Sequence, residues 1–298
     1  FMNKNKNFSV RKVIEKNNVA GYVFALPFII GFSAFIVVPM AMSLYFSFCD
    51  YNILSPEKWV GLKNYDGLFQ DPKFWNSLKV TLKYAVFAVP LKLLFSLLVA
   101  LLLLRATRLT PIYRAAYYLP SIMGASVAVS VLWKQLFTGD GLINQLLGAE
   151  ISWLGNTKTA IWVLILLSVW QFGSSMLIFL GVLKQIPQEL YEAAEVDGAG
   201  PLFRFFRITL PLLTSTIFFN LVMQSINGLL VFAQGQIITA GKPMGSTEFY
   251  VLYMYQQAFE FNKAGYASAL GWVMVLLIAL FTVFLFATKK FWVYEGGY

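Results

Sequence analysis

The sequence has no histidine, a single cysteine and little charge. Its 298 residues carry 23 Lys+Arg and 14 Asp+Glu, so that only 12% are charged while 58% are hydrophobic. Without histidine the chain has no histidine general base, no histidine metal ligand and no Ser-His or Cys-His nucleophilic pair. Cys49 has no second thiol for a disulfide or a metal site, and inert packing is its favoured role. These absences exclude much of enzyme chemistry.

The shortage of charge also argues against an ordinary soluble domain. Soluble domains are roughly 25% charged, whereas this chain combines 12% charge with 28 Phe, 15 Tyr and 8 Trp. A soluble fold of this length would leave large aromatic patches exposed. The composition therefore predicts an integral membrane protein. The net charge of +9 then serves to fix orientation in the bilayer, and it does not indicate nucleic acid binding.

Long runs without charge mark the expected membrane spans. About 20 apolar residues cross a bilayer, and a charge at its centre is costly. The charge-free runs therefore predict an all-α integral membrane fold with six transmembrane helices. These lie near residues 22–48, 84–104, 115–137, 159–183, 208–233 and 264–288. They form one transmembrane domain, residues 20–290, between the terminal segments 1–19 and 291–298.

The basic residues predict which side each loop faces. If the N-terminus is cytoplasmic, every arginine lies on the cytoplasmic side, and basic residues there outnumber those outside. The cytoplasmic set is Lys4, Lys6, Arg11, Lys12, Lys16, Arg105, Arg108, Arg114, Lys184, Arg204, Arg207, Lys289 and Lys290. The positive-inside rule thus favours both termini in the cytoplasm of a multi-pass cell-membrane protein.

The loop over 185–207, between the fourth and fifth expected spans, carries the strongest local pattern. Pro187 can open a short helix whose first turns are acidic, where the helix dipole favours negative charge. Gly198, Gly200 and Pro201 end this helix and turn the chain into a second short basic piece. A thin helix between two such breakers is suited to entering a groove on another protein.

Within this loop the sequence resembles a known family. Glu192-Ala-Ala, then Gly198, and after nine residues Ile208-Thr-Leu-Pro211 match the complete EAA signature of the membrane subunits of binding-protein-dependent ABC importers. The resemblance implies a type I importer permease whose cytoplasmic coupling helix docks into the ATPase and transmits its nucleotide-driven closure. The coupling residues that it implies are Glu189, Glu192, Ala193, Ala194, Asp197, Gly198 and Arg204.

Further segments are similar to the carbohydrate branch of that family. Residues 60–65 with 71–81 resemble the stretch before its second span, and residues 239–247 with 258–269 resemble its external loop and the start of its last span. Lys242 departs from the pattern, because a glycine usually precedes this proline. The resemblance implies uptake of a sugar or oligosaccharide.

The resemblance also implies a set of partners. These are a second homologous permease in a heterodimer, two ATPase subunits and an extracytoplasmic solute-binding protein, all in contact with or near membrane lipid. It implies no cofactor in this chain, because ATP and magnesium belong to the ATPase. The organism that this branch implies is a bacterium.

A sugar path needs hydrogen-bonding side chains at mid-membrane depth, where such groups are otherwise costly. Polar residues at helical spacing share one face of the fifth span, and Gln171 is central in the fourth. The predicted path residues are Gln171, Ser174, Thr216, Asn220, Gln224, Asn227 and Lys92. An equal alternative is that these groups hold helices together by hydrogen bonds.

Lys92 interrupts the second span and has two interpretations. In the favoured one its ammonium reaches toward the outer interface, with the aliphatic stem on apolar surface. In the other it faces the cavity and pairs with a carboxylate of a partner chain or of an acidic substrate. The sequence does not name the solute, and an importer of glycerol phosphates or another small polar solute remains an alternative. An intramembrane enzyme is disfavoured, because no acidic residue lies within the charge-free runs.

Overall fold

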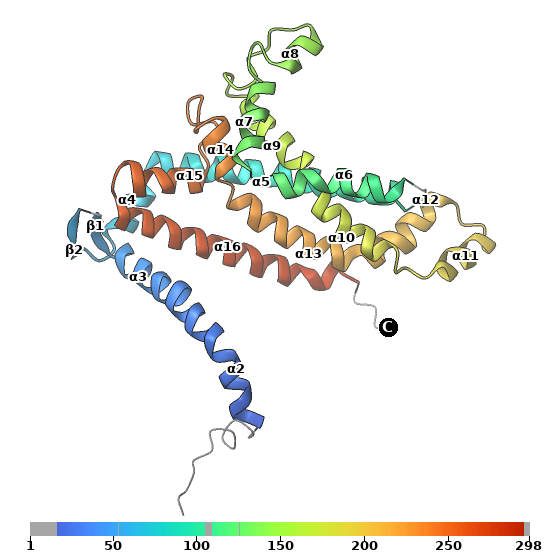
Figure 1. The fold of residues 1–298 in the computed structure, drawn as a ribbon, viewed down its shortest axis with the longest axis horizontal. Coiled ribbons are helices and arrows are strands. Elements are labelled where there is room, and N and C mark those ends of the chain that lie inside the picture. The colour runs from blue at the N-terminus through green and yellow to red at the C-terminus, as the bar shows by residue number, and fades with distance from the viewer. Residues whose placement is uncertain (1–16, 53, 105–108, 125, 295–298) are drawn as a thin grey trace, which may run out of the picture.

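The computed structural model describes residues 17–52, 54–104, 109–124 and 126–294. Of the terminal segments predicted at 1–19 and 291–298, residues 1–16 and 295–298 lie outside these residues, as do Arg105 and Arg108. The described chain is an elongated helical bundle from which two arms project (Figure 1). One arm is N-terminal, and the other carries α7 and α8. The long helices run along the long axis of the bundle, so their ends lie at its two opposite ends.

The first expected span is one apolar helical arm with a π-helical turn inside it. It consists of α2 (Asn17–Phe32), the π-helical turn (Ser33–Val37) and α3 (Val38–Ser47). Pro39 has no backbone N–H, and beside it the Val38 N–H donates to the Ser33 carbonyl, which is the spacing of a π-turn. The most apolar window within Phe24–Ser47 has no residue buried in this chain. This arm therefore presents its apolar surface outward.

A hairpin and a long helix follow at the far end of the arm. The elements are β1 (Cys49–Asn52), which pairs antiparallel with β2 (Ser55–Trp59), then α4 (Lys63–Gln70) and α5 (Pro72–Leu102). The helix α5 starts earlier than residue 84, where the second span was expected to begin. Asp71 caps it, because its carboxylate accepts the Lys73 N–H at 2.8 Å. Lys83, which comes just before the predicted second span, is an exposed residue of this same helix.

The third and fourth expected spans are bent pairs of helices. The pairs are α6 (Thr110–Met123) with α7 (Val127–Leu136), and α9 (Ala160–Trp170) with α10 (Gly173–Leu183). The first pair bends by 99° and the second by 41°. Between them lies α8 (Leu142–Leu147). At the second bend Gly173 packs directly on α6, since a Cβ there would lie 2.2 Å from the Tyr117 carbonyl oxygen. Among the described residues, four helices are long and apolar enough to span a membrane alone, and there are up to six spans if each bent pair is one.

The predicted short helices of the 185–207 loop are present. They are α11 (Gln188–Val196) and α12 (Pro201–Arg204), and a π-helical turn (Phe205–Thr209) joins α12 to α13 (Leu210–Leu229). The chain then forms α14 (Ala233–Ile238), α15 (Tyr250–Tyr255), a π-helical turn (Gln256–Glu260) and α16 (Ala264–Trp292). The stretch Pro201–Leu229 is one continuous apolar helix. It begins before residue 208, where the fifth span was expected to begin. The second short piece of the loop and the expected fifth span therefore form one helix.

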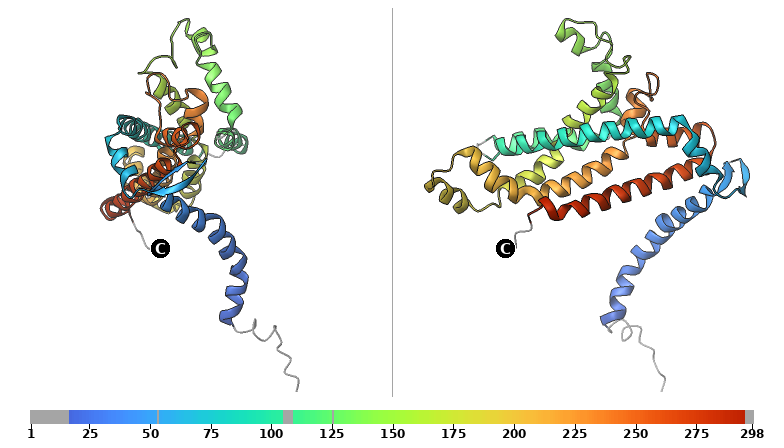
Figure 2. Two further views of the ribbon diagram at one scale, coloured as in Figure 1. Left: turned by 90° about the vertical axis from the view of Figure 1, so that its left-hand side faces the viewer. Right: turned by 180° about the vertical axis from the view of Figure 1, so that it is seen from behind.

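The helix α5 is the centre of the bundle. It packs against α9, α10, α13 and α15, and Figure 2 shows α5, α13 and α16 side by side along the long axis. Buried side chains form three clusters along these helices, exemplified by Tyr84 against Phe249 and by Leu93 beside Met176. Because lipid tails are as apolar as leucine, close packing holds such helices together in a membrane.

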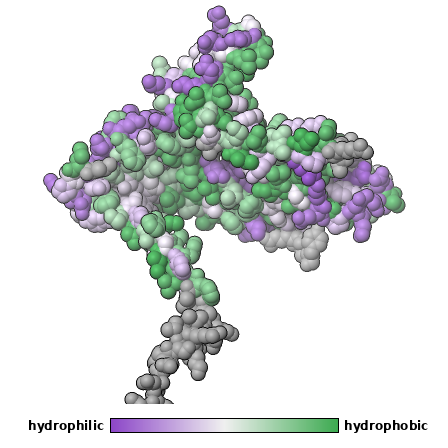
Figure 3. Space-filling view, in the orientation of Figure 1, coloured by the Kyte–Doolittle hydropathy of each residue, from purple (hydrophilic) through white to green (hydrophobic). Residues whose placement is uncertain are grey.

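The surface separates into polar ends and an apolar middle. Hydrophilic residues gather at both ends of the long axis, and hydrophobic residues cover much of the body between them (Figure 3). The end with α11 and α12 lies opposite the end with the hairpin and α4 (Figure 1). This division is what a bilayer around the middle of the bundle requires.

Candidate functional site

A cavity with several polar lining residues lies where α5, α9, α13 and α14 meet. Its volume is about 380 Å³. The polar residues that line it are Tyr84, Lys92, Ser168, Gln171, Gln224, Asn227 and Gln234. Four of the predicted path residues, Gln171, Gln224, Asn227 and Lys92, are thus brought together at one place. Sites for small molecules are hollows of roughly this size, about 300–1,000 Å³, with a few convergent polar groups.

Gln171 sits at the break between α9 and α10, and this break turns its side chain into the cavity. Its Nε2 donates to the Gly124 carbonyl at 3.2 Å, and its Oε1 accepts from Gln234 Nε2 at 3.3 Å. Nearby, the Ser121 hydroxyl donates to the Gln171 carbonyl at 3.0 Å and accepts the Ser174 N–H at 3.0 Å. These bonds satisfy backbone groups that a continuous helix would have paired itself.

The polar stripe of α13 divides between the cavity and the helix packing. Gln224 and Asn227 line the cavity, and Gln224 Nε2 donates to the Ser175 hydroxyl at 3.1 Å. Asn220 is buried and donates to the Thr216 carbonyl of its own helix at 3.0 Å. Asn220, Thr216 and Ser174 are not among the described residues that line the cavity.

Lys92 faces the cavity, which differs from the outward course favoured by the sequence. It follows Tyr84 and Ala88 at intervals of four residues, so the three lie on one face of α5. The early start of α5 explains the difference. Lys92 lies twenty residues after Pro72, roughly 30 Å along the axis at 1.5 Å per residue. The outer end of the helix is therefore beyond the reach of its ammonium.

Three lining residues escaped the sequence analysis. Tyr84 was placed at the outer boundary of a span, and Ser168 was one hydroxyl in a strongly apolar run. Gln234 lies in α14, a helix within a stretch that was expected to be loop. The four-residue spacing from Lys92 could have found Tyr84, whereas only the folded arrangement brings α14 over the cavity.

The hairpin of α11 and α12 forms one end of the molecule. The predicted coupling residues Glu189, Glu192, Ala193 and Asp197 are exposed, and α11 has no buried residue. The Arg204 guanidinium donates to Glu195 at 2.8 Å across the turn. Gly198 makes this turn with a φ of +77°, a conformation that costs other residues roughly 1–2 kcal/mol.

A hollow of about 490 Å³ lies between the two short helices. Its lining comprises Ala194, Asp197, Gly198, Ala199, Gly200 and Phe203. On the inner side, the Tyr191 hydroxyl and the Thr209 hydroxyl are 2.8 Å apart. This contact joins α11 to the π-helical turn Phe205–Thr209, which leads into α13. The hairpin therefore has a fixed base and an exposed tip.

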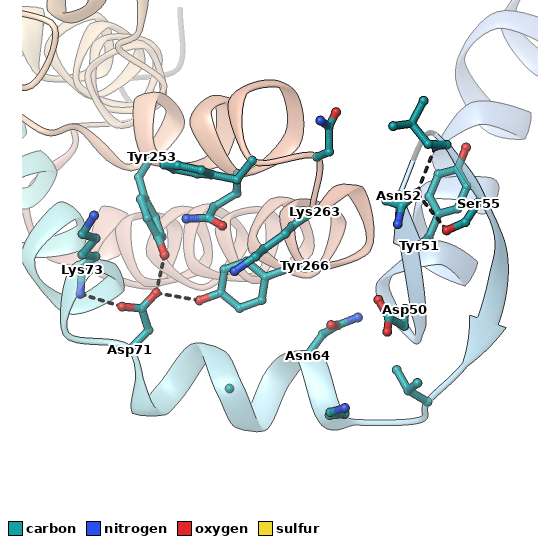
Figure 4. Close-up of a pocket in the computed structure, with 17 residues that line it drawn as sticks. Asp50, Tyr51, Asn52, Ser55, Asn64, Asp71, Lys73, Tyr253, Lys263 and Tyr266 are labelled. Atoms are coloured by element: carbon teal, nitrogen blue, oxygen red, sulfur yellow. Dashed lines mark hydrogen bonds between the residues drawn. The ribbon is translucent and has the colours of Figure 1, made fainter.

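A second, larger cavity of about 870 Å³ occupies the opposite end, between the β hairpin, α4, the start of α5 and α16 (Figure 4). Asp71, Lys73, Tyr266 and Asn64 belong to segments that resembled the carbohydrate branch, and here they face one hollow. The structure thus joins segments far apart in sequence around one site at this end of the bundle, called here the outer site after the predicted orientation.

Asp71 holds this outer site together. Its carboxylate accepts hydrogen bonds from the hydroxyls of Tyr253 and, at 3.0 Å, Tyr266 (Figure 4). Burial alone would raise the pKa of Asp71, but the hydrogen bonds from Tyr253, from the Lys73 N–H and from Tyr266 outweigh it. The pKa of this carboxyl is therefore below its ordinary value. Asp71 links the N-terminus of α5 to α15 and α16.

These features define a class of protein. Long apolar helices between polar ends are the features of a multi-pass membrane protein. Residues 71–291 match the family described as "Binding-protein-dependent transport system inner membrane component". The chain belongs to this family and is a transport subunit.

The chain is similar over nearly its whole length to curated transport proteins. It is 50% identical to the "Probable ABC transporter permease protein YesP" of Bacillus subtilis, covering 94% of each chain. It is 30% identical to the "Probable starch degradation products transport system permease protein AmyD" of Thermoanaerobacterium thermosulfurigenes, covering 92% of this chain and 96% of the relative. These relatives agree with the predicted class of membrane permease.

The fold is also that of a solved transporter chain. A crystal structure of a bacterial alginate ABC transporter, in complex with an alginate pentasaccharide-bound periplasmic protein, contains a chain that matches this one with a TM-score of 0.79. The sequences are 23% identical, and the match covers 94% of this chain and 97% of that one. This likeness supports the predicted helical membrane fold, from which the chain departs by the hairpin of β1 and β2.

Proposed function

We propose that the chain is a permease subunit of an ATP-driven importer of sugars or oligosaccharides in a bacterial cell membrane. Family membership supports the importer, and the relative AmyD, described as a permease for starch degradation products, supports a saccharide as the solute. The observation that carries the proposal is the cavity in which Gln171, Gln224 and Asn227 converge, where α5, α9, α13 and α14 meet. Amides donate and accept hydrogen bonds at once, as sugar hydroxyls require.

The cavity forms half of the translocation path. It is lined from this chain by α5, α9, α13 and α14, and a second homologous permease supplies the facing wall in the heterodimer. Six spans, with each bent pair crossing once and both termini in the cytoplasm, place α11 and α12 inside the cell. The outer cavity around Asp71 then lies on the side where the solute-binding protein delivers saccharide.

The hairpin of α11 and α12 couples the path to the ATPase. The acidic turn of α11 and its exposed apolar side chains Leu190 and Val196 suit a groove on one of the two ATPase subunits. The ion pair between Glu195 and Arg204 and the contact between Tyr191 and Thr209 join α11 to the continuous helix Pro201–Leu229. Gln224 and Asn227 lie on that helix, so displacement of α11 moves the cavity wall.

Uptake by the reconstituted complex tests the proposal. Proteoliposomes would hold this chain, its partner permease and the ATPase subunits, with the solute-binding protein added outside and ATP inside. We expect accumulation of labelled di- and trisaccharides that requires both ATP and this chain. Accumulation of glycerol phosphate without any saccharide would favour the alternative importer. Uptake of neither, in a complex that hydrolyses ATP, would contradict the proposal.

A further inference from the structure

Lys92 puts one positive charge on the wall of the central cavity. Among the described residues that line the cavity it is the single charged side chain, and none of them is Asp or Glu. No ion pair or hydrogen bond of its ammonium is found within the described chain. The group that pairs with the Lys92 ammonium is therefore not supplied by the described residues.

The depth of Lys92 makes this charge costly without a partner. It lies ten residues before Leu102, the last residue of α5, which is roughly 15 Å or half the thickness of a bilayer core. Lysines reach the interface from near helix ends, and at mid-depth an ionisable residue needs a partner or a water-filled cavity. In such surroundings a charge attracts an opposite charge more strongly than in water.

The residues around Lys92 indicate the chemistry of the group that pairs with it. Gln171, Gln224 and Asn227 offer neutral groups that pair with hydroxyls, and Lys92 adds one cation that pairs with an anion. One lysine matches a single negative charge. A phosphate dianion is usually held by several cations or by the fork of an arginine, and the described lining holds neither.

We propose that Lys92 selects an anionic saccharide by pairing with its carboxylate inside the cavity, while the three amides bind its hydroxyls. The substrate class is an oligosaccharide that carries a uronic acid. This inference rests on the proposed function, since it names the substrate class of the same path. Lys92 is the specificity-determining residue of this chain.

Matched probes and matched variants test the inference in the complete reconstituted complex. The probes are di- and triuronates of galacturonic, glucuronic and mannuronic acid, each beside its methyl ester, in which the carboxylate is masked, and a monosulfated disaccharide. The variants are Lys92→Met, which keeps the length of the side chain, and Lys92→Arg, which keeps its charge. Lys83→Met is the control, because Lys83 is exposed on α5 and outside the cavity lining.

We expect wild type to accumulate at least one uronate faster than its ester. Lys92→Met should slow uptake of that uronate about tenfold or more and leave the ester unchanged, whereas Lys92→Arg and Lys83→Met retain the uronate. An equal loss for acid and ester, or a complex that falls apart in Lys92→Met, would show that the lysine pairs with a partner-chain carboxylate. Preference for the sulfated sugar alone would overturn the carboxylate assignment.

The two proposals fail in different ways. If wild type takes up neutral esters with ATP but prefers no acid, the role of Lys92 is wrong and the saccharide importer stands. If ATP drives no saccharide uptake in any variant, the importer proposal fails and this inference fails with it.

Discussion

The guanidinium of Arg204 lies 2.8 Å from the carboxylate of Glu195, across the turn made by Gly198. The two side chains belong to different short helices, and the pair joins α11 to α12 across this turn. The Glu195 side chain is 69% exposed, and ion pairs on a surface contribute only about 0–1 kcal/mol to stability. In the proposed coupling role, the pair would serve to pass motion from α11 to α12.

Breaking this pair should reduce coupling with little loss of stability. In Glu195→Gln the hairpin keeps its turn at Gly198 but loses the brace, so we expect less saccharide imported for each ATP hydrolysed. The thermal unfolding temperature should stay within a few degrees, because the change in free energy is under about 1 kcal/mol. The double variant Glu195→Arg with Arg204→Glu restores the pair and should restore coupling. A double variant as poor as the single one would show that the pair itself is not the cause.

Reversing the charge of Glu192 should uncouple the transporter. Glu192 is exposed in the middle of α11, and Glu192→Lys puts a cation on the surface of a helix that is proposed to enter the ATPase. We expect normal insertion, continued ATP hydrolysis and uptake reduced about tenfold or more, as for loss of an interface anchor. Glu150→Lys is the control, because it makes the same reversal on an exposed residue of another loop. Full uptake in Glu192→Lys would contradict the coupling role.

Gly173 should tolerate no side chain. A Cβ there would lie 2.2 Å from the Tyr117 carbonyl oxygen and 2.7 Å from the Tyr118 Cα, both backbone atoms of α6. Gly173→Ala must push α10 and α6 apart, at a cost of about 1–3 kcal/mol. Gly181→Ala is a matched control in the same helix, because a Cβ there meets nothing within 4 Å. Thermal unfolding of the purified protein should therefore fall for the first variant and be unchanged for the second.

The helical fold is predicted well from the sequence, because charge-free runs mark the long helices and glycine and proline mark where short helices end. The helix α11 and its stop at Gly198 follow from local rules, and so does the position of Gln171 in the middle of a span. The bend at Gln171 does not follow, because it depends on the close contact of Gly173 with α6. Lys92 shows the same limit. Charge counting began the second span near residue 84, whereas the capped helix begins at Pro72, and only the folded arrangement shows that Lys92 lines the cavity.

The candidate sites show the same division between local and long-range information. Helical spacing put Asn220 on one face with Gln224 and Asn227, yet a stripe of this width covers both the cavity and the packing beside it. The outer cavity was hidden because its lining comes from segments far apart in sequence. Asp71 and Tyr266, for example, are 195 residues apart and form one hydrogen bond.

The outer site should weaken at low pH. The pKa of Asp71 in the folded protein is below its ordinary value of about 3.9. The charged carboxylate therefore contributes stability at pH above that value, and this contribution is lost as the pH falls through the lower pKa of the folded state. Unfolding temperatures measured from pH 7 to pH 3 should fall less steeply for Asp71→Asn than for wild type.

Two asparagines of the same helix should separate the path from the packing. Asn227 lines the cavity, whereas Asn220 is 1% exposed and bonded to the Thr216 carbonyl. Asn227→Ala should raise the KM for saccharide about threefold to tenfold, since one hydrogen bond to the solute is lost, and leave thermal stability unchanged. Asn220→Ala should lower stability by about 0.5–1.5 kcal/mol and leave KM unchanged. The reverse pattern would place the path on the other side of α13, and unchanged KM in both variants would mean that the amides of this helix serve packing alone.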